Sequence, residues 1–312
     1  MASSCAGFRR HSVTTVVFLL VPRLHLLDLA GPAQVFSTAA DLGHGYRLRY
    51  VAEHEEVPTA QGVPLRAGTA WPVLEPDDLV IVPGWRGRFG AHARLSGATR
   101  DALAAHHAIG GTVASVCAGA YALAQAGLLD GRRCTTHHAL QDELAARYPA
   151  VRVQRDVLFV VDDRVITSAG IASGIDLALH LIAVRHGAAD AAKVAREMVV
   201  YARRNGDEPQ RSAMLRHRAH LSDAVHRAQD LIDARYQDRL PLAEIAAACD
   251  VSPRTLTRLF TTATGMTPLR YQQTLRLERA ENLIAHGATV EAAARTTGFD
   301  DARMLRRLRS RG

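Results

Sequence analysis

Cys117 is the residue best suited to covalent chemistry in this chain, because a thiolate is a strong nucleophile. It comes directly after the β-branched run Thr112–Val116 and before an Ala-rich stretch of helical character. A thiol at such a strand-to-helix turn has the geometry of a nucleophile elbow. The dipole and the free amide groups of the helix N-terminus are expected to lower its pKa.

Two further side-chain types could complete a site around this thiol. His137 lies 20 residues after Cys117 and is followed by His138, and either imidazole could act as a base. Asp28 comes just after the first predicted strand, and the carboxyl ends of parallel strands meet at one edge of a sheet. One interpretation is a nucleophile with His137 as its base, as in a hydrolase, hydratase or glyoxalase-type enzyme. The others are a thiol that binds a small effector or senses oxidants, and a buried structural thiol.

Arginine side chains near the C-terminus form a second set with chemical meaning. Residues 242–261 and 290–309 each contain an Ala-rich amphipathic helix, a small turn and a second helix rich in arginine. That is a helix-turn-helix pattern, and one such unit fits one major groove of DNA. Arginine can pair with guanine through two hydrogen bonds, and threonine can contact phosphate or a thymine methyl. The residues expected to contact DNA are Arg254, Thr255, Thr257 and Arg258 in the first unit and Ala302, Arg303, Arg306 and Arg307 in the second.

The framework that positions these residues follows from the alternation of apolar runs. Short β-branched runs alternate with Ala- and Leu-rich stretches, which predicts a parallel sheet with helices on both faces. Residues 157–167 are interpreted as a hairpin appended to it, and 171–186 and 188–203 as two closing helices. The expected strands are 16–20, 46–52, 79–82, 112–116 and 158–161, with helices that include 31–40 and 100–107. The predicted fold class is α/β, a flavodoxin-like doubly wound parallel sheet followed by an all-α domain with two helix-turn-helix units.

The length of 312 residues favours two domains. Gly, Pro and alternating charges break the pattern after position 204, so we predict a sheet domain over 12–204, a linker over 205–220 and a helical domain over 221–312. The net charge of +7 suits a polyanionic partner, although Lys193 is the sole lysine and part of the arginine content reflects composition.

The cysteines and the N-terminus bear on the compartment. Cys5, Cys117, Cys134 and Cys249 have no paired spacing, which argues against disulfides and zinc and favours a reducing interior. No metal and no cofactor is predicted. The apolar run 13–21 is short and is interpreted as a buried first strand rather than a signal peptide, so no membrane partner is expected. We expect a cytoplasmic bacterial protein that is associated with the nucleoid when bound to DNA.

The C-terminal part resembles the DNA-binding domain of AraC/XylS transcription regulators. The resemblance covers about 221–309 and is carried by 252–261 and 264–285, including Gly265 and Pro268. It implies that Arg254, Thr257 and Arg258 read bases in the first unit. The family usually has an aromatic core residue where this chain has Arg309, and it continues with a Gly-x-x-Pro turn and a last helix. Because Asp300 and Asp301 would repel phosphate, the first unit is expected to carry most of the base recognition.

The N-terminal part resembles the class I glutamine amidotransferase-like superfamily, in its PfpI group. The resemblance covers about 12–203 and is carried by 27–37, 82–86, 116–138 and 166–182. It places Asp28 where a glutamate commonly hydrogen-bonds the elbow cysteine, and His138 where a tryptophan is frequent. With the AraC-type tail, the chain looks like the GlxA-type regulators.

Together these patterns predict a sequence-specific transcription regulator that a small molecule bound near Cys117 modulates. Effector binding is favoured over turnover, because a regulator needs differential binding and not catalysis. The alternative is a PfpI-like cysteine-dependent enzyme with a non-essential DNA-binding tail. The expected partners are a double-stranded DNA operator, an unknown small-molecule effector and a second copy of the chain, with RNA polymerase as a further candidate.

Overall fold

The computed structural model describes residues 13–86, 94–200, 206, 210, 217–218, 220–285 and 287–310. The chain divides into two compact units, Met1–Gln210 and Arg211–Gly312, which are described separately. The predicted linker 205–220 lies mostly outside the described residues, so the predicted domain limits stay predictions. Cys5 also lies outside them.

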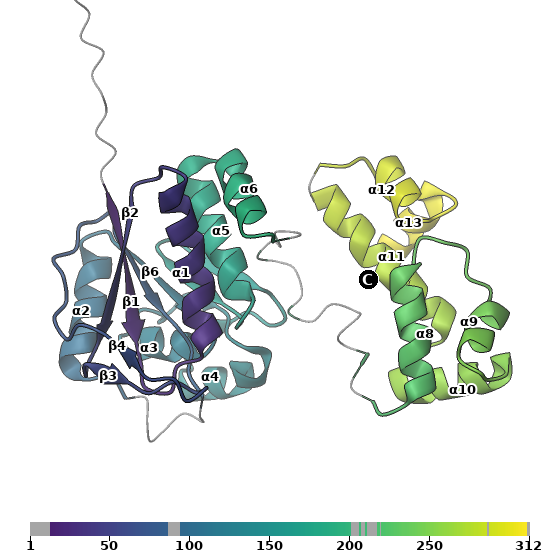
Figure 1. The fold of residues 1–312 in the computed structure, drawn as a ribbon, viewed down its shortest axis with the longest axis horizontal. Coiled ribbons are helices and arrows are strands. Elements are labelled where there is room, and N and C mark those ends of the chain that lie inside the picture. The colour runs from purple at the N-terminus through teal and green to yellow at the C-terminus, as the bar shows by residue number, and fades with distance from the viewer. Residues whose placement is uncertain are drawn as a thin grey trace, which may run out of the picture. The chain divides into compact units, whose positions relative to one another are not determined.

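The first unit is built on a six-stranded sheet with the order β2-β1-β5-β6-β10-β9 (Figure 1). Neighbouring strands from β2 to β10 are parallel, and β9 is antiparallel to β10. The order of the five parallel strands is that of a flavodoxin-like fold, which confirms the predicted fold class. The strands are β1 (Thr14–Leu20), β2 (Tyr46–Ala52), β5 (Leu79–Val82), β6 (Thr112–Val116), β9 (Phe159–Asp162) and β10 (Val165–Ser168).

The predicted hairpin needs a correction at its second arm. β10 is not appended to the sheet, because it pairs with β6 in parallel and all four of its residues are buried. Only the first arm, β9, extends the sheet as an antiparallel edge. The register sets Ser168 opposite Val116, so the loop after β10 begins beside the residue that precedes Cys117.

Helices cover the sheet in two groups (Figure 1). α1 packs on α5, which packs on α6, while α2 and α3 contact each other and β6. α1 begins at Leu26, five residues before the expected start, so Asp28 lies in its first turn. The predicted second closing helix is shorter, because α6 ends at Glu197 and residues 201–203 are outside the described part. The helices are α1 (Leu26–Asp41), α2 (Gly97–Ala108), α3 (Ala120–Gln125), α4 (Gln141–Arg147), α5 (Ser173–His186) and α6 (Ala188–Glu197).

Two short strand pairs lie beside this sheet. β3 (Glu56–Val57) pairs with β4 (Leu65–Arg66), and β7 (Arg133–Cys134) pairs with β8 (Arg152–Val153). Runs of two residues are too short to give a period-2 signal. β7 matters for the site, because the residues that follow it pass beside Cys117.

The second unit is entirely helical in its described part and contains two small cores (Figure 1). Leu256, Phe260 and Tyr271 are central to the first core, and Phe299 and Leu305 to the second. α11 contributes to both cores and so connects the two helix-turn-helix units. The helices are α8 (Asp223–Ala234), α9 (Leu242–Ala248), α10 (Pro253–Thr264), α11 (Pro268–Ala285), α12 (Val290–Thr296) and α13 (Ala302–Arg309). In the described part of the chain, no helix has both the length and the apolar composition that crossing a bilayer requires.

The loop 236–238 braces the two cores against each other. Gln272 and Arg276 of α11 donate hydrogen bonds to its backbone carbonyls, among them Tyr236 O at 3.0 and 2.6 Å. Gly298, which lies between α12 and α13 of the second helix-turn-helix unit, packs on the same loop and has φ +79°. A Cβ atom at Gly298 would lie 2.1 Å from the carbonyl oxygen of Gln237, so no larger residue fits there.

Candidate thiol site and nucleic-acid interface

The thiol lies on a strained elbow, as the sequence pattern predicts. β6 ends at Val116, and Cys117 has φ +53°, a conformation that residues other than glycine rarely adopt. Cys117–Gly119 form one 3-10 turn that leads into α3. Thr136, just after β7, donates its hydroxyl to the carbonyl oxygen of Cys117 at 2.7 Å. This hydrogen bond holds the elbow from its side.

Asp28 lies directly against the elbow and is completely buried. Its Oδ2 accepts a hydrogen bond from the backbone N–H of Gly84 at 3.1 Å. A Cβ atom built on Gly84 would lie 2.5 Å from Asp28 Oδ2 and 2.6 Å from Cys117 Cβ. The close approach of these residues therefore depends on the missing side chain at position 84.

His137 approaches the thiol from the opposite loop. A Cβ atom on Gly170 would lie 3.0 Å from His137 Cδ2 and 3.4 Å from Cys117 Sγ, so both groups border the same point. His137 also caps the short turn His138–Leu140, and its Nδ1 accepts the backbone N–H of Ala139 at 3.3 Å. This hydrogen bond assigns the proton of the neutral ring to Nε2.

The electrostatics of the thiol differ from the expectation. Burial, and after it the negative charge of Asp28, raise the pKa of Cys117 to about 12. The expected lowering by backbone amides is present but outweighed: the N–H of Ala118 lowers the pKa of the thiol, whereas burial and Asp28 raise it more. Burial also raises the pKa of Asp28 to about 6, against the opposing effect of the Gly84 hydrogen bond. At neutral pH the site therefore holds a neutral thiol beside a carboxylate.

The structure thus brings together Cys117, Asp28 and His137, the three residues proposed from sequence. In this state the thiol is not activated, since its proton is held tightly and the base nitrogen Nδ1 of His137 accepts another hydrogen bond. Thr136, Gly84 and Gly170 also belong to the site, and they were not predicted from the sequence. The two glycines directly follow Pro83 and Ala169 at the carboxyl ends of parallel strands, and that pattern was the available signal. Within the described ranges, no group of three or more His, Cys, Asp or Glu could hold a metal ion.

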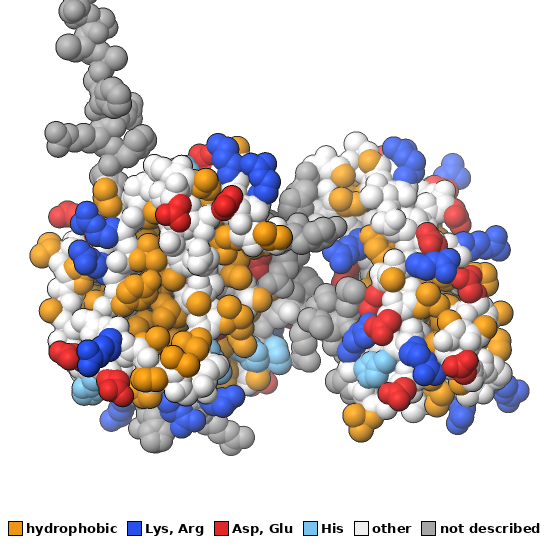
Figure 2. Space-filling model, viewed as in Figure 1, with side chains coloured by type: hydrophobic (Ala, Val, Ile, Leu, Met, Phe, Trp, Pro, Cys, Tyr) orange, Lys and Arg blue, Asp and Glu red, His pale blue; other side chains and the backbone are white. Residues whose placement is uncertain are grey.

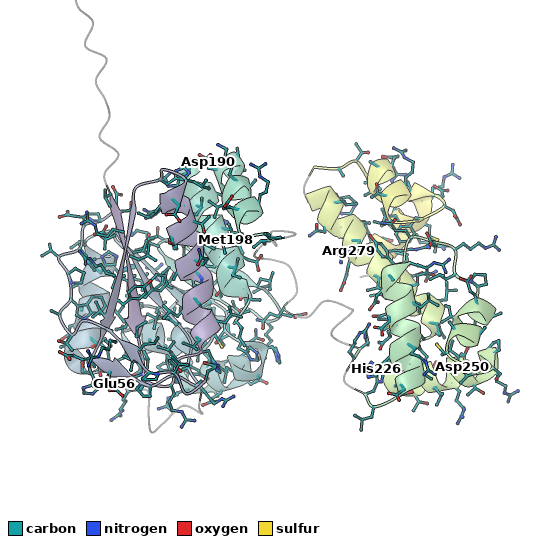
Figure 3. All side chains as sticks on the ribbon, viewed as in Figure 1. Glu56, Asp190, Met198, His226, Asp250 and Arg279 are labelled. Carbon is teal, nitrogen blue, oxygen red and sulfur yellow. The ribbon has the colours of Figure 1, made fainter. Side chains whose placement is uncertain are left out.

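In the second unit, α10 has the start that the sequence predicts for a recognition helix. Ser252 is its N-cap and accepts the backbone N–H of Thr255 at 3.2 Å, and Pro253 occupies the first helical position. Asp250, labelled in Figure 3, lies in the turn after α9 with φ +58°. Aspartate tolerates this left-handed conformation better than most residues. The turn sets α10 across α9, and the two helices pack through the buried Ile245 and Leu256.

The outward face of α10 forms a shallow depression of about 540 Å³. It is lined by Leu242, Pro253, Arg254, Thr257, Arg258, Thr261 and Thr262. Arg254 and Arg258 are exposed, and among the described residues neither has an acidic partner within 4.0 Å. Thr262 continues the i, i+4 spacing of these two arginines and was missed. Thr255 lies outside this face, and its hydroxyl is 2.9 Å from Ser252 Oγ.

In the second helix-turn-helix unit the arginines are partly engaged. Arg306 pairs with Glu291 of α12, so one predicted DNA contact is already in an ion pair. Asp301 caps α13 by accepting the backbone N–H of Arg303 at 2.7 Å. Arg303 and Arg307 are exposed. The space-filling view shows blue and red side chains interspersed over the visible face of the helical unit (Figure 2).

Comparison with known protein families matches residues 14–184, more than half of the chain, to the DJ-1/PfpI family. The chain belongs to the DJ-1/PfpI family. Residues 234–311 match a helix-turn-helix domain, so this member of the DJ-1/PfpI family carries a DNA-binding module after its sheet domain. Both resemblances seen in the sequence are confirmed.

The relatives of this DJ-1/PfpI protein include regulators and an enzyme. It is 28% identical to the HTH-type transcriptional regulator GbdR of Pseudomonas aeruginosa over 274 residues, which are 86% of this chain and 73% of GbdR. The HTH-type transcriptional regulator GlxA of Rhizobium meliloti also matches, at 28% identity over 61% of this chain and 59% of GlxA. Isonitrile hydratase of Pseudomonas putida is 35% identical over 53% of this chain and 68% of the enzyme.

A solved structure gives the same fold for the DJ-1/PfpI part. The AraC family transcriptional regulator from Pseudomonas putida superposes with a TM-score of 0.51 and 22% identity. The match covers 59% of this chain and 99% of that one.

Proposed function

We propose that the chain is a DNA-binding transcription regulator of the AraC type, in which α10 supplies the main base-reading surface. The observation that carries the proposal is the pair Arg254 and Arg258, exposed on a capped helix of a helix-turn-helix unit. Guanidinium groups without an acidic partner are available for guanine and phosphate. The regulator GbdR, which is similar over most of the chain, supports the same conclusion.

The DJ-1/PfpI domain is proposed to bind a small effector at the elbow of Cys117. The protonated thiol, the carboxylate of Asp28 and the imidazole of His137 offer both donors and acceptors to a polar ligand. None of them is activated for attack in the state seen here. A regulator requires a ligand that favours one conformation over another, and the strained backbone of Cys117 offers a place where two conformations could differ.

A cysteine-dependent enzyme is the second candidate function, and the similarity to isonitrile hydratase favours it. In that case ligand binding would have to lower the pKa of the thiol and release Nδ1 of His137 from the N–H of Ala139. The variant Cys117→Ala distinguishes the two functions. An enzyme loses turnover and keeps its DNA binding, whereas a regulator loses the effect of its ligand on DNA binding.

The remaining partners follow from these assignments. A homodimer is proposed, because AraC-type modules read asymmetric half-sites and pairing doubles the contact with DNA. Figure 2 shows hydrophobic side chains gathered over α1 and the neighbouring strands, and this face is the candidate for pairing. Contact with RNA polymerase and a place on the nucleoid are proposed consequences of operator binding.

The decisive experiment selects duplexes from random DNA with the full chain and then measures affinity in rising salt. A regulator should prefer the selected duplex to random DNA by at least about a thousandfold. Equal affinity for both, with the steep salt dependence of phosphate contacts, would argue against sequence-specific regulation.

A further inference from the structure

Two described residues that follow α6, Gly206 and Gln210, form hydrogen bonds with the sheet domain. Gly206 accepts backbone hydrogen bonds from Leu158 and Phe159, at 2.8 and 3.2 Å. A Cβ atom on Gly206 would lie 2.7 Å from the carbonyl oxygen of Phe159 and 2.8 Å from its ring. This glycine therefore packs tightly against the start of β9. The sequence pattern at Gly206 indicates only a linker, so this packing is a finding of the structure.

Gln210 makes the second attachment. Its backbone N–H donates to Asp156 Oδ1 at 3.1 Å. Its side-chain Nε2 donates to the carbonyl oxygens of Thr136 at 2.9 Å and Val157 at 3.0 Å. A longer contact of 3.4 Å reaches the hydroxyl of Thr135. One amide group thus joins the end of β7 to the approach to β9.

The residue that Gln210 binds is also the residue that holds the elbow. Thr136 gives its hydroxyl to the carbonyl oxygen of Cys117, while its own carbonyl accepts Gln210. Thr136 is completely buried and closely packed, so a displacement of the elbow must also displace the groups that contact Thr136. The path from Cys117 to the interdomain segment contains one residue.

The attachment is suited to being reversible. Gln141 also donates to the carbonyl oxygen of Thr136, at 3.2 Å, so this buried acceptor keeps a partner when Gln210 leaves. Gln210 itself is half-buried and regains water on leaving. Exchanging such hydrogen bonds for hydrogen bonds to water changes the free energy of docking little. The binding energy of a small ligand can therefore shift the equilibrium between docked and released Gln210.

We propose that Gln210 is a latch through which the state of the Cys117 elbow controls the segment that carries the DNA-binding unit. The proposal rests on the proposed function, because it concerns the regulation of that same effector site. With the elbow as described, Gly206 and Gln210 are docked on the sheet domain. A ligand that moves the Cys117 carbonyl pulls Thr136 with it and releases Gln210. Release changes how the DNA-binding unit is tethered, and thereby its affinity for an operator.

Hydrogen exchange in the full chain tests the latch directly. The amides of Leu158 and Phe159 report docking, because Gly206 is their acceptor. Gln210→Glu replaces the donor by a carboxylate that faces two carbonyl oxygens, so exchange at these two amides should rise about tenfold. Gln34→Ala, an exposed glutamine on α1, is the matched control and should leave it unchanged.

A second pair of variants tests the connection to the elbow. Thr136→Val removes only the hydroxyl that binds Cys117, yet it should speed exchange at Leu158 and Phe159 by about threefold if the latch senses the elbow. Thr136→Ser keeps the hydroxyl and should restore protection. Unchanged exchange in Gln210→Glu, or equal exchange in the Val and Ser variants, would overturn the proposal.

A measurement of DNA binding distinguishes this proposal from the proposed function. With a duplex selected by the wild-type chain, Gln210→Glu should change the dissociation constant at least threefold and Gln34→Ala should not. Faster exchange with an unchanged dissociation constant would show that the latch opens without controlling DNA binding, and would also overturn it. If the wild type selects no duplex, the regulator assignment fails, whereas the exchange measurements still decide whether Gln210 responds to Thr136.

Discussion

The backbone N–H of Gly84 points at Oδ2 of Asp28 across 3.1 Å and holds this carboxylate beside the thiol of Cys117. Burial makes this carboxylate costly when ionised, although Gly84, Ile171 and Cys117 donate hydrogen bonds to it, and its raised pKa records that cost. The site is therefore less stable than a neutral one, which is typical of positions kept for binding.

Replacing Asp28 by asparagine should stabilise the fold at pH 7.5. The pKa is raised from 3.8 to about 6, so the carboxylate lowers stability increasingly between pH 4 and 6 and fully above that range. The increase in the free energy of unfolding should reach up to about 3 kcal/mol at pH 7.5 and shrink to less than about 1 kcal/mol at pH 4, where the folded-state carboxyl is protonated and the unfolded-state one is about half protonated. Urea unfolding at the two pH values measures it. Asp163→Asn, at an exposed turn, is the control, and an equal gain at both pH values would contradict the assignment.

Arg254→Ala and Arg258→Ala should each weaken binding to the selected duplex by about 1–3 kcal/mol and relax the base preference at one position. The reason is the loss of a guanidinium that has no acidic partner among the described residues. Fluorescence anisotropy with point-mutated duplexes measures both effects. Arg279→Ala, an exposed arginine of α11 labelled in Figure 3, is the matched control. Full affinity in the Arg254/Arg258 double variant would refute the assignment of α10.

Glu291→Ala should strengthen DNA binding, because it releases Arg306 from its ion pair in the second helix-turn-helix unit. A released arginine can contact phosphate, so the slope of log K against log salt should steepen by about one unit. Arg306→Ala alone should cost less than Arg254→Ala, since much of its charge is already neutralised. A titration series over salt checks both variants. A weaker Glu291→Ala protein with an unchanged slope would show that the pair positions α13 for DNA.

Cys117 should be slow to react with iodoacetamide at pH 7.5. With a pKa raised to about 12, the thiolate fraction is so small that alkylation should run at least about a hundredfold slower than that of glutathione. Asp28→Asn removes the charge that opposes deprotonation and should speed the reaction. Mass spectrometry of the peptide with Cys117 follows the rate against pH. A rate midpoint below pH 8 would mean that the resting thiol is activated after all.

The sequence predicted well whatever depends on local pattern. The elbow at Cys117 and the capped start of α10 at Ser252 follow from periodicity and turn residues, and the structure confirms the fold class. Gly31 and Pro32 signalled a helix start, but α1 begins at Leu26 because its packing on α5 outweighs the local cost of proline.

What depends on distant neighbours could not be predicted. The direction of the Cys117 pKa shift is set by burial and by Asp28, which is 89 positions away in the chain. The ion pair of Arg306 with Glu291 joins two helices, and no spacing rule links them. The docking of Gln210 was hidden for the same reason, since a glutamine in a polar segment carries no periodic signal.

The brace formed by Gln272, Arg276 and Gly298 around the loop 236–238 also bears on the operator. Because these contacts link the two helix-turn-helix units, we expect α10 and α13 to keep a constant spacing, so that on DNA they would enter two successive major grooves. Two successive major grooves on one side of the duplex are about 10.5 base pairs apart. An operator lengthened by half a helical turn between its two contact sites would present the second major groove on the opposite side of the duplex. Only one of the two helices could then bind in its groove.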